Sequence, residues 1–67
     1  MASTLTLEEA WRMAIEKERE SRELYLRLGA MTDDSAAKDL FRFLAGEEQR
    51  HEQMLQDEFD RAFMQDM

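Results

Sequence analysis

The sequence predicts an all-α protein in which two long helices form an antiparallel hairpin. Three observations support this class. The 67 residues contain no proline, and Gly29 and Gly46 are the only glycines. Good helix formers outnumber β-branched residues. Only residues 30–35 have the composition of a turn, and the apolar residues on either side of them recur with a helical period. We therefore expect a single domain that covers residues 1–67.

The first helix is expected at about residues 7–30. Thr6 is a favourable N-cap, and Glu9, three residues later, completes a capping box. A mainly apolar stripe with helical spacing runs along one side of this helix and is interrupted once, by Glu18. Its members are Leu7, Trp11, Ala14, Glu18, Ser21, Tyr25 and Leu28.

A turn at about residues 31–34 leads into the second helix, which is expected at about residues 34–63. Thr32 or Asp33 can cap this helix. Gly46, in its middle, makes the helix less stable by ~1 kcal/mol relative to alanine. The close approach of another helix would be a reason for this glycine; the alternative is that the helix simply tolerates it. The stripe of the second helix consists of Ala37, Phe41, Leu44, Glu48, His51, Leu55, Phe59 and Ala62.

One hairpin cannot cover the wide apolar sides of both helices, and a monomer of this size buries little core. Pairing two hairpins would cover them in a four-helix bundle. We therefore predict a homodimer or a higher homo-oligomer of this chain.

The charge and composition exclude several classes of partner. A formal net charge of −7 disfavours nucleic acid. No apolar run approaches the ~20 residues that cross a bilayer, and the N-terminus lacks the features of a signal peptide. Because there is no cysteine, thiolate metal sites and thiol catalysis are excluded. We expect a cytoplasmic protein.

The two polar interruptions of the stripes are predicted to meet. Glu18 lies fifteen residues before Asp33, at the centre of the turn, and Glu48 lies fifteen residues after it. Equal distances from the turn give equal heights in an antiparallel hairpin. His51 shares a helix face with Glu48, because they are three residues apart. Two carboxylates and one imidazole should therefore converge in one layer.

Two interpretations of this layer are open. In the first, the layer is structural. Ordinary helix ion pairs have the spacing found between Glu47 and His51 and between Glu18 and Arg22. Such a polar layer could set the register of the helices in an adaptor bundle. Alternatively, the layer binds metal. Two chains related by a two-fold axis would supply the glutamates and Glu-x-x-His motifs of a dinuclear carboxylate site. These donors suit iron or manganese, with zinc as an alternative. The matched heights and the apolar residues around both interruptions favour metal.

Two segments that carry this pattern resemble the ferritin-like superfamily, and within it the rubrerythrin and encapsulated-ferritin branch. They are residues 14–25 (AIEKERESRELY) and residues 40–51 (LFRFLAGEEQRH). A metal-binding glutamate seven residues before a tyrosine matches Glu18 and Tyr25. The second glutamate of a Glu-Glu-x-x-His run matches Glu48, with His51 as the histidine. Rubrerythrins carry all four helices in one chain and a cysteine-bearing rubredoxin-like domain, and this sequence has neither.

The resemblance implies a ferritin-like four-helix bundle with a di-iron site of Glu18, Glu48 and His51 across the dimer interface. It implies a ferroxidase that oxidises Fe(II) to Fe(III) with dioxygen or peroxide, for iron storage or detoxification. Rubrerythrin-like peroxide reduction is the alternative activity. Encapsulated ferritins lie within a protein shell, so an encapsulin-type shell and a nanocompartment are further expectations.

Three more residues are candidates around the site. Tyr25 lies two turns from Glu18 on the same face, where it can donate a hydrogen bond beside the ligands, act as a redox-active neighbour or simply pack in the core. Glu20 and Glu52 can guide incoming cations, although solvated helix faces explain them more simply.

Overall fold

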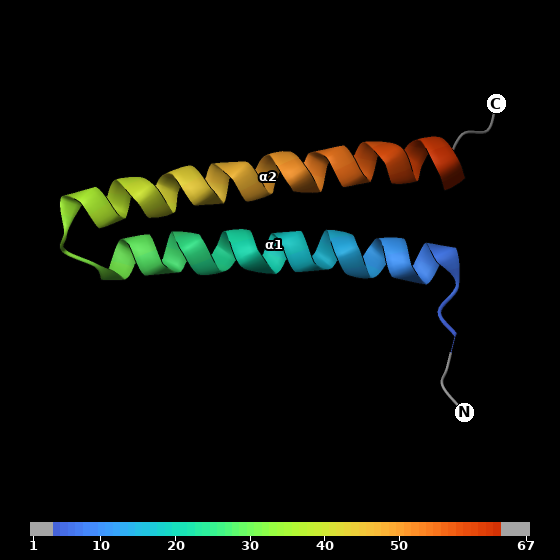
Figure 1. Ribbon diagram of the computed structural model, residues 1–67, viewed down its shortest axis with the longest axis horizontal. Helices are drawn as coiled ribbons and strands as arrows, with labels where there is room; N and C mark the ends of the chain where they lie inside the picture. Colours follow the sequence, from blue (N-terminus) through green and yellow to red (C-terminus); the bar gives the residue numbers. More distant parts are fainter. Residues whose placement is uncertain (1–3, 64–67) are drawn as a thin grey trace.

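The computed structural model describes residues 4–63 and shows two helices side by side in an antiparallel hairpin (Figure 1). Helix α1 is Leu7–Met31, and helix α2 is Ser35–Phe63. The predicted all-α hairpin is confirmed. Residues 1–3 and 64–67 of the expected domain lie outside the described part. Within residues 4–63, neither helix has an apolar stretch sufficient to cross a membrane.

Helix α1 begins with the predicted capping box. The Thr6 hydroxyl accepts a hydrogen bond from the Glu9 main-chain N–H at 3.0 Å, and the Glu9 carboxylate accepts one from the Thr6 N–H at 2.9 Å. Two N–H groups that the helix leaves without partners are thus satisfied, which is typically worth about 1 kcal/mol for the N-cap alone. The start of α1 is therefore encoded locally.

The cap of α2 differs from the prediction, which named Thr32 or Asp33. Asp34 performs this role: its carboxylate accepts from the Ala37 N–H at 3.0 Å, and its carbonyl accepts from the Lys38 N–H at 2.9 Å. Thr32 instead ends α1 with an extended backbone. Helix α1 continues one residue further than expected, so the connection is shorter and the cap of α2 shifts to the residue next to Ser35.

The helices approach closely at Gly29 and not at Gly46. A Cβ atom at Gly29 would lie 3.4 Å from the Cβ of Phe41, whereas a Cβ at Gly46 would have no atom of the described chain within 4 Å. The Lys38 ammonium also donates to the Gly29 carbonyl at 3.0 Å. Gly29 therefore lies where α2 packs against α1 near the turn, and within this hairpin no such approach occurs at Gly46.

Aromatic contacts hold both ends of the hairpin. At the open end, Phe59 packs against Phe63 with ring centroids 4.9 Å apart, and the Trp11 indole N–H donates to the Leu55 carbonyl at 2.9 Å. Near the turn, Tyr25 stacks on Phe41 at a centroid distance of 6.3 Å. These contacts join positions far apart in the chain and so set the register of the helices.

Packing of the two helices leaves much of the predicted apolar surface uncovered. Only Ala45 and Phe59 are buried among residues 4–63. Ten large apolar side chains remain exposed: Leu5, Leu7, Met13, Leu24, Leu26, Met31, Leu40, Phe43, Met54 and Phe63. Each stripe is thus wider than the strip that the partner helix covers, and a single hairpin has no closed core.

Much of this uncovered surface lies on one side, which we call the open face. It consists of Leu7, Ala10, Ala14 and Leu24 from α1 and Leu40, Phe43 and Met54 from α2. On each helix these residues lie along one side, in rows with a spacing of three or four positions. The middle of the same rows is polar and consists of Lys17 and Ser21 on α1 and Glu47 and Arg50 on α2. His51 belongs to the same row, because it precedes Met54 by three residues.

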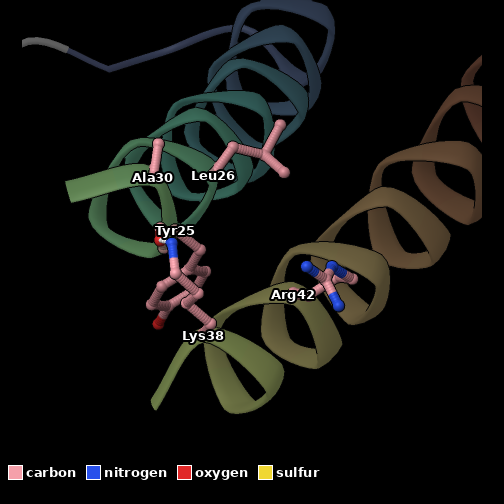
Figure 2. A pocket seen from close by; sticks show the side chains of 6 residues that line it. Tyr25, Leu26, Ala30, Lys38 and Arg42 are labelled. Atoms are coloured by element: carbon pink, nitrogen blue, oxygen red, sulfur yellow. Dashed lines mark hydrogen bonds between the residues drawn. The ribbon is translucent and has the colours of Figure 1, made fainter. Parts of the chain in front are cut away.

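The opposite side is more polar and carries two shallow hollows. Near the turn, a hollow of about 240 Å³ lies beside Tyr25, Leu26 and Ala30 of α1 and is bordered by Lys38 and Arg42 of α2 (Figure 2). The second hollow, of about 220 Å³, is lined mainly by polar side chains, including Arg19 and Gln56. We call this side the polar face. The two sides of the hairpin therefore differ in what they can contact.

Candidate metal centre

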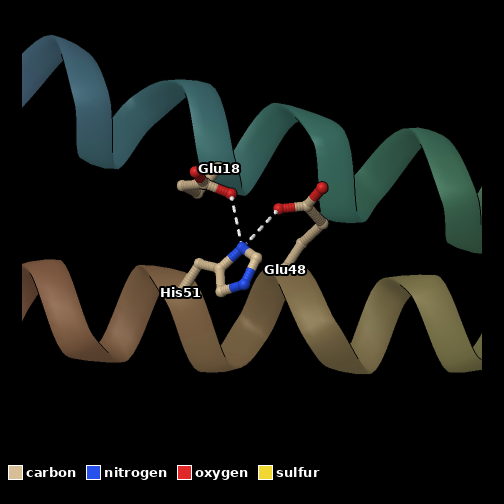
Figure 3. Close-up of side chains that lie close together, drawn as sticks. All are labelled: Glu18, Glu48 and His51. Atoms are coloured by element: carbon tan, nitrogen blue, oxygen red, sulfur yellow. Dashed lines mark hydrogen bonds and ion pairs between the residues drawn. The ribbon is translucent and has the colours of Figure 1, made fainter.

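Glu18, Glu48 and His51 meet between the helices at the middle of the hairpin (Figure 3). The His51 Nδ1 atom lies 3.3 Å from a carboxylate oxygen of Glu48 and 3.5 Å from one of Glu18. One donor atom from each residue lies within 4.8 Å of the other two. The predicted convergence of these three side chains, which we call the triad, is confirmed.

The triad is partly open to one side. The exposed fraction of the side chain is 27% for Glu18, 20% for Glu48 and 49% for His51. The exposure arises because one hairpin covers only one side of each helix. Since His51 is in the row of the open face, this is the side on which the triad is accessible.

The alternative ion pairs predicted from helical spacing do not form. Glu47 pairs with Arg50 and not with His51. Arg22 reaches across to Glu52 of α2, at 2.6 Å, and not back to Glu18. Within residues 4–63, no lysine or arginine lies within ion-pair distance of the Glu18 or Glu48 carboxylate, so their only such partner is His51.

The electrostatics of Glu18 reflect this lack of positive partners. The Glu48 carboxylate, through a shared hydrogen bond and charge repulsion, and partial burial together raise the pKa of Glu18 above its usual 4.5, while His51 opposes the shift. A cation between the two carboxylates would remove the repulsion that raises this pKa. The metal-free arrangement is therefore a site of excess negative charge.

The donor atoms fit a divalent transition metal. Two carboxylates and one imidazole combine hard oxygen donors with a borderline nitrogen donor, a set that suits iron, manganese or zinc. His51 must be neutral for its ring nitrogen to bind metal. Three donors from one chain also leave further coordination positions for water, substrate or another chain.

The remaining predicted residues lie in different settings. Tyr25 stacks on Phe41 towards the turn, Glu20 is exposed on α1, and Glu52 is held by Arg22. Their roles as a hydrogen-bond donor and as cation-guiding residues stay predictions. The sequence reasoning missed Arg22 as a partner of Glu52. The sequence contained a signal for this pair, because Arg22 lies four residues after Glu18 and Glu52 lies four residues after Glu48.

Comparison with known proteins gives one match. The rubrerythrin family matches residues 1–59. Neither the curated proteins nor the solved structures show a significant match. The match includes all three triad residues and all of α1. Together with the helical hairpin and the carboxylate–histidine cluster, it shows that this chain belongs to the rubrerythrin family.

Proposed function

We propose that this chain is a ferroxidase that oxidises Fe(II) to Fe(III) at a di-iron site built by a homodimer. The observation that carries the proposal is the triad, in which two carboxylates meet an imidazole and no lysine or arginine of residues 4–63 balances them. Buried or half-buried carboxylates without a counter-charge are unfavourable, so a cation is the simplest partner.

A second copy would complete the site. One chain offers two carboxylates and one imidazole, and a two-fold pair would offer four carboxylates and two imidazoles, the inventory of dinuclear carboxylate bundles. The open face carries exposed large apolar side chains from both helices, and His51 of the triad lies in its row on α2. Burying this surface on a second hairpin would also supply the core that one hairpin lacks.

In this proposal the residues have distinct tasks. Glu48 is the candidate to bridge two irons, and Glu18 and His51 bind one iron each. The carboxylates stabilise the higher charge of Fe(III), and the apolar surroundings exclude water. Iron is the substrate: two Fe(II) ions lose one electron each, and dioxygen takes up both electrons and two protons to give hydrogen peroxide. Manganese or zinc would bind to the same donors without this oxidation.

The test is aerobic oxidation of ferrous iron, followed by the absorbance of the ferric product and by metal analysis of the protein. His51→Ala and Glu48→Ala should abolish protein-dependent oxidation. Glu16→Ala removes a carboxylate that pairs with Arg19 and lines a hollow of the polar face, so this variant should oxidise iron like the wild type. Oxidation at the wild-type rate in His51→Ala would overturn the proposal, and an unchanged metal-free dimer would support a structural adaptor instead.

The homodimer has its own test. Leu40→Asp, on the open face, should convert the dimer to a monomer in light scattering and abolish oxidation, although it leaves the triad intact. Leu26→Asp is the matched control, because Leu26 is similarly exposed but borders the hollow of the polar face. Equal effects of the two changes would argue against pairing through the open face.

Family membership favours one second candidate, reduction of hydrogen peroxide. The same site would then use peroxide as the oxidant of Fe(II). Single-turnover oxidation by peroxide and by dioxygen, compared in the same preparation, separates the two activities. Larger homo-oligomers of this chain and an encapsulin-type shell around it are further partners to be tested.

A further inference from the structure

A second charged group lies next to the triad. The Arg22 guanidinium and the Glu52 carboxylate are 2.6 Å apart, and only 24% and 22% of their side chains are exposed. All the other lysine or arginine ion pairs described in residues 4–63 join neighbours on the same helix and have at least one partner that is about half exposed or more. Among the lysine and arginine ion pairs of residues 4–63, only this one joins α1 to α2.

The position of the pair follows from the direction of the helices. Arg22 is one turn after Glu18 on α1, and Glu52 is one turn after Glu48 on α2. Because the helices are antiparallel, these two steps lead in opposite directions along the hairpin. The contact between Arg22 and Glu52 must therefore pass across the level of the triad.

The pair and the triad lie towards different sides of the hairpin. Arg22 follows Arg19 by three residues, and Glu52 precedes Gln56 by four, and both of these neighbours line a hollow of the polar face. The His51 side chain is 49% exposed, and His51 lies in the row of the open face. Arg22 and Glu52 thus border the triad on the side away from the proposed second copy.

We propose that Arg22 is a positioning residue that keeps Glu52 out of the ligand set of the triad and supplies a positive charge beside it. This inference rests on the proposed metal site. Glu52 follows His51 directly, and its carboxylate would be a third one near the same metal. Because Arg22 holds the Glu52 carboxylate away from the metal, each chain supplies only two carboxylates and one imidazole. A coordination position then stays open for oxidant or water.

The consequences for metal binding follow from charge and ligand number. Without Arg22, the Glu52 carboxylate is released and a repulsive positive charge is lost, so a divalent ion should bind more tightly and with more ligands. Without Glu52, the Arg22 charge is no longer balanced, so the ion should bind more weakly. Partners beside metal ligands typically change affinity by about ten- to a hundredfold, which sets the size of effect to look for.

The experiment uses Co²⁺ as a spectroscopic probe of the full-length chain, with its affinity from titration and its coordination number from the d–d absorption. Arg22→Gln should bind Co²⁺ at least about tenfold more tightly, with weaker d–d bands that indicate a higher coordination number. Arg22→Gln/Glu52→Gln should restore the wild-type bands, because the additional ligand is gone. Arg22→Lys should also resemble the wild type, since the charge is retained.

Two controls complete the design. Arg19→Gln removes an exposed arginine that pairs with Glu16 and should leave the bands unchanged. Glu52→Gln alone should weaken Co²⁺ binding while circular dichroism shows the same helix content. This single variant provides a test even if Arg22→Gln folds poorly.

The outcomes separate the two proposals. If the wild type binds Co²⁺ and His51→Ala does not, the metal site stands. In that case, an Arg22→Gln spectrum identical to the wild type, or a change that persists in the double variant, overturns the role of Arg22 alone. A wild type that binds no Co²⁺ overturns the proposed function and this inference with it.

Discussion

The ends of the hairpin and its middle hold the same two helices together by different means. At the open end, Phe59 is only 4% exposed and packs against Phe63, and the Arg12 guanidinium lies 4.8 Å from the Phe59 ring centroid. Near the turn, Tyr25 stacks on Phe41. Between these aromatic layers, the helices face each other through the triad and through the Arg22–Glu52 ion pair.

The difference shows which part of the chain serves stability. Aromatic pairs contribute about 0.5–1.5 kcal/mol beyond the burial of their surface, and burial adds more. The charged middle contributes less, because the cost of removing charges from water offsets much of the attraction in a largely buried ion pair, and two like charges oppose each other within the triad. The ends set the register of the helices, and the middle can therefore carry groups suited to a ligand.

The largest loss of stability is expected when the buried aromatic ring at the open end is removed. Phe59→Ala should reduce the free energy of unfolding by about 3–5 kcal/mol, because it deletes a ring with almost no exposure and leaves a cavity. The measurement is urea unfolding at a fixed protomer concentration. Leu26→Ala, at a position 53% exposed, should change stability much less. Equal losses would mean that the open end is not a packed layer.

A smaller effect is expected from the hydrogen bond that ties Trp11 to α2. Trp11→Phe keeps an aromatic ring but removes the N–H that donates to the Leu55 carbonyl, so it should reduce the free energy of unfolding by about 1 kcal/mol. Circular dichroism during thermal unfolding measures the change. Stability equal to that of the wild type would show that ring packing alone, without the hydrogen bond, holds this end.

The smallest expected effect is a change with pH in the stability of the metal-free protein, and it arises in the triad. The raised pKa of Glu18 means that the folded state binds more protons than the unfolded chain between pH 4.5 and that raised value. Its contribution to the free energy of unfolding therefore falls as pH rises through this window. Glu18→Gln should remove this decrease, so its stability relative to wild type should increase with pH.

The matched control for this pH series is Glu23→Gln, which removes an exposed carboxylate from the same helix. The stability difference from wild type should change less with pH for Glu23→Gln than for Glu18→Gln. Similar pH profiles for the two variants would contradict the assignment of the effect to the triad. Addition of a divalent metal should reduce the effect, because a bound cation keeps Glu18 ionised.

Local signals in the sequence were sufficient to predict the two helices and the residue at which α1 begins. Thr6 and Glu9 form the predicted box because both partners are within one helical turn. The cap of α2 was predicted less well, because Thr32, Asp33 and Asp34 are all competent and the choice depends on where α1 ends. A close approach of another helix was one of two explanations considered for Gly46, and within the hairpin the close approach occurs at Gly29, because helix spacing depends on which faces meet.

The composition and the periodic spacing of residues by themselves determined an antiparallel helical hairpin and the convergence of Glu18, Glu48 and His51, because heights on two antiparallel helices follow from distance to the turn. Only the tertiary structure decided the partners of each charge. Arg22 could reach Glu18 on its own helix or Glu52 on the other, and the packing of α1 against α2 brings it to Glu52. That choice leaves no lysine or arginine of residues 4–63 within ion-pair distance of the triad carboxylates.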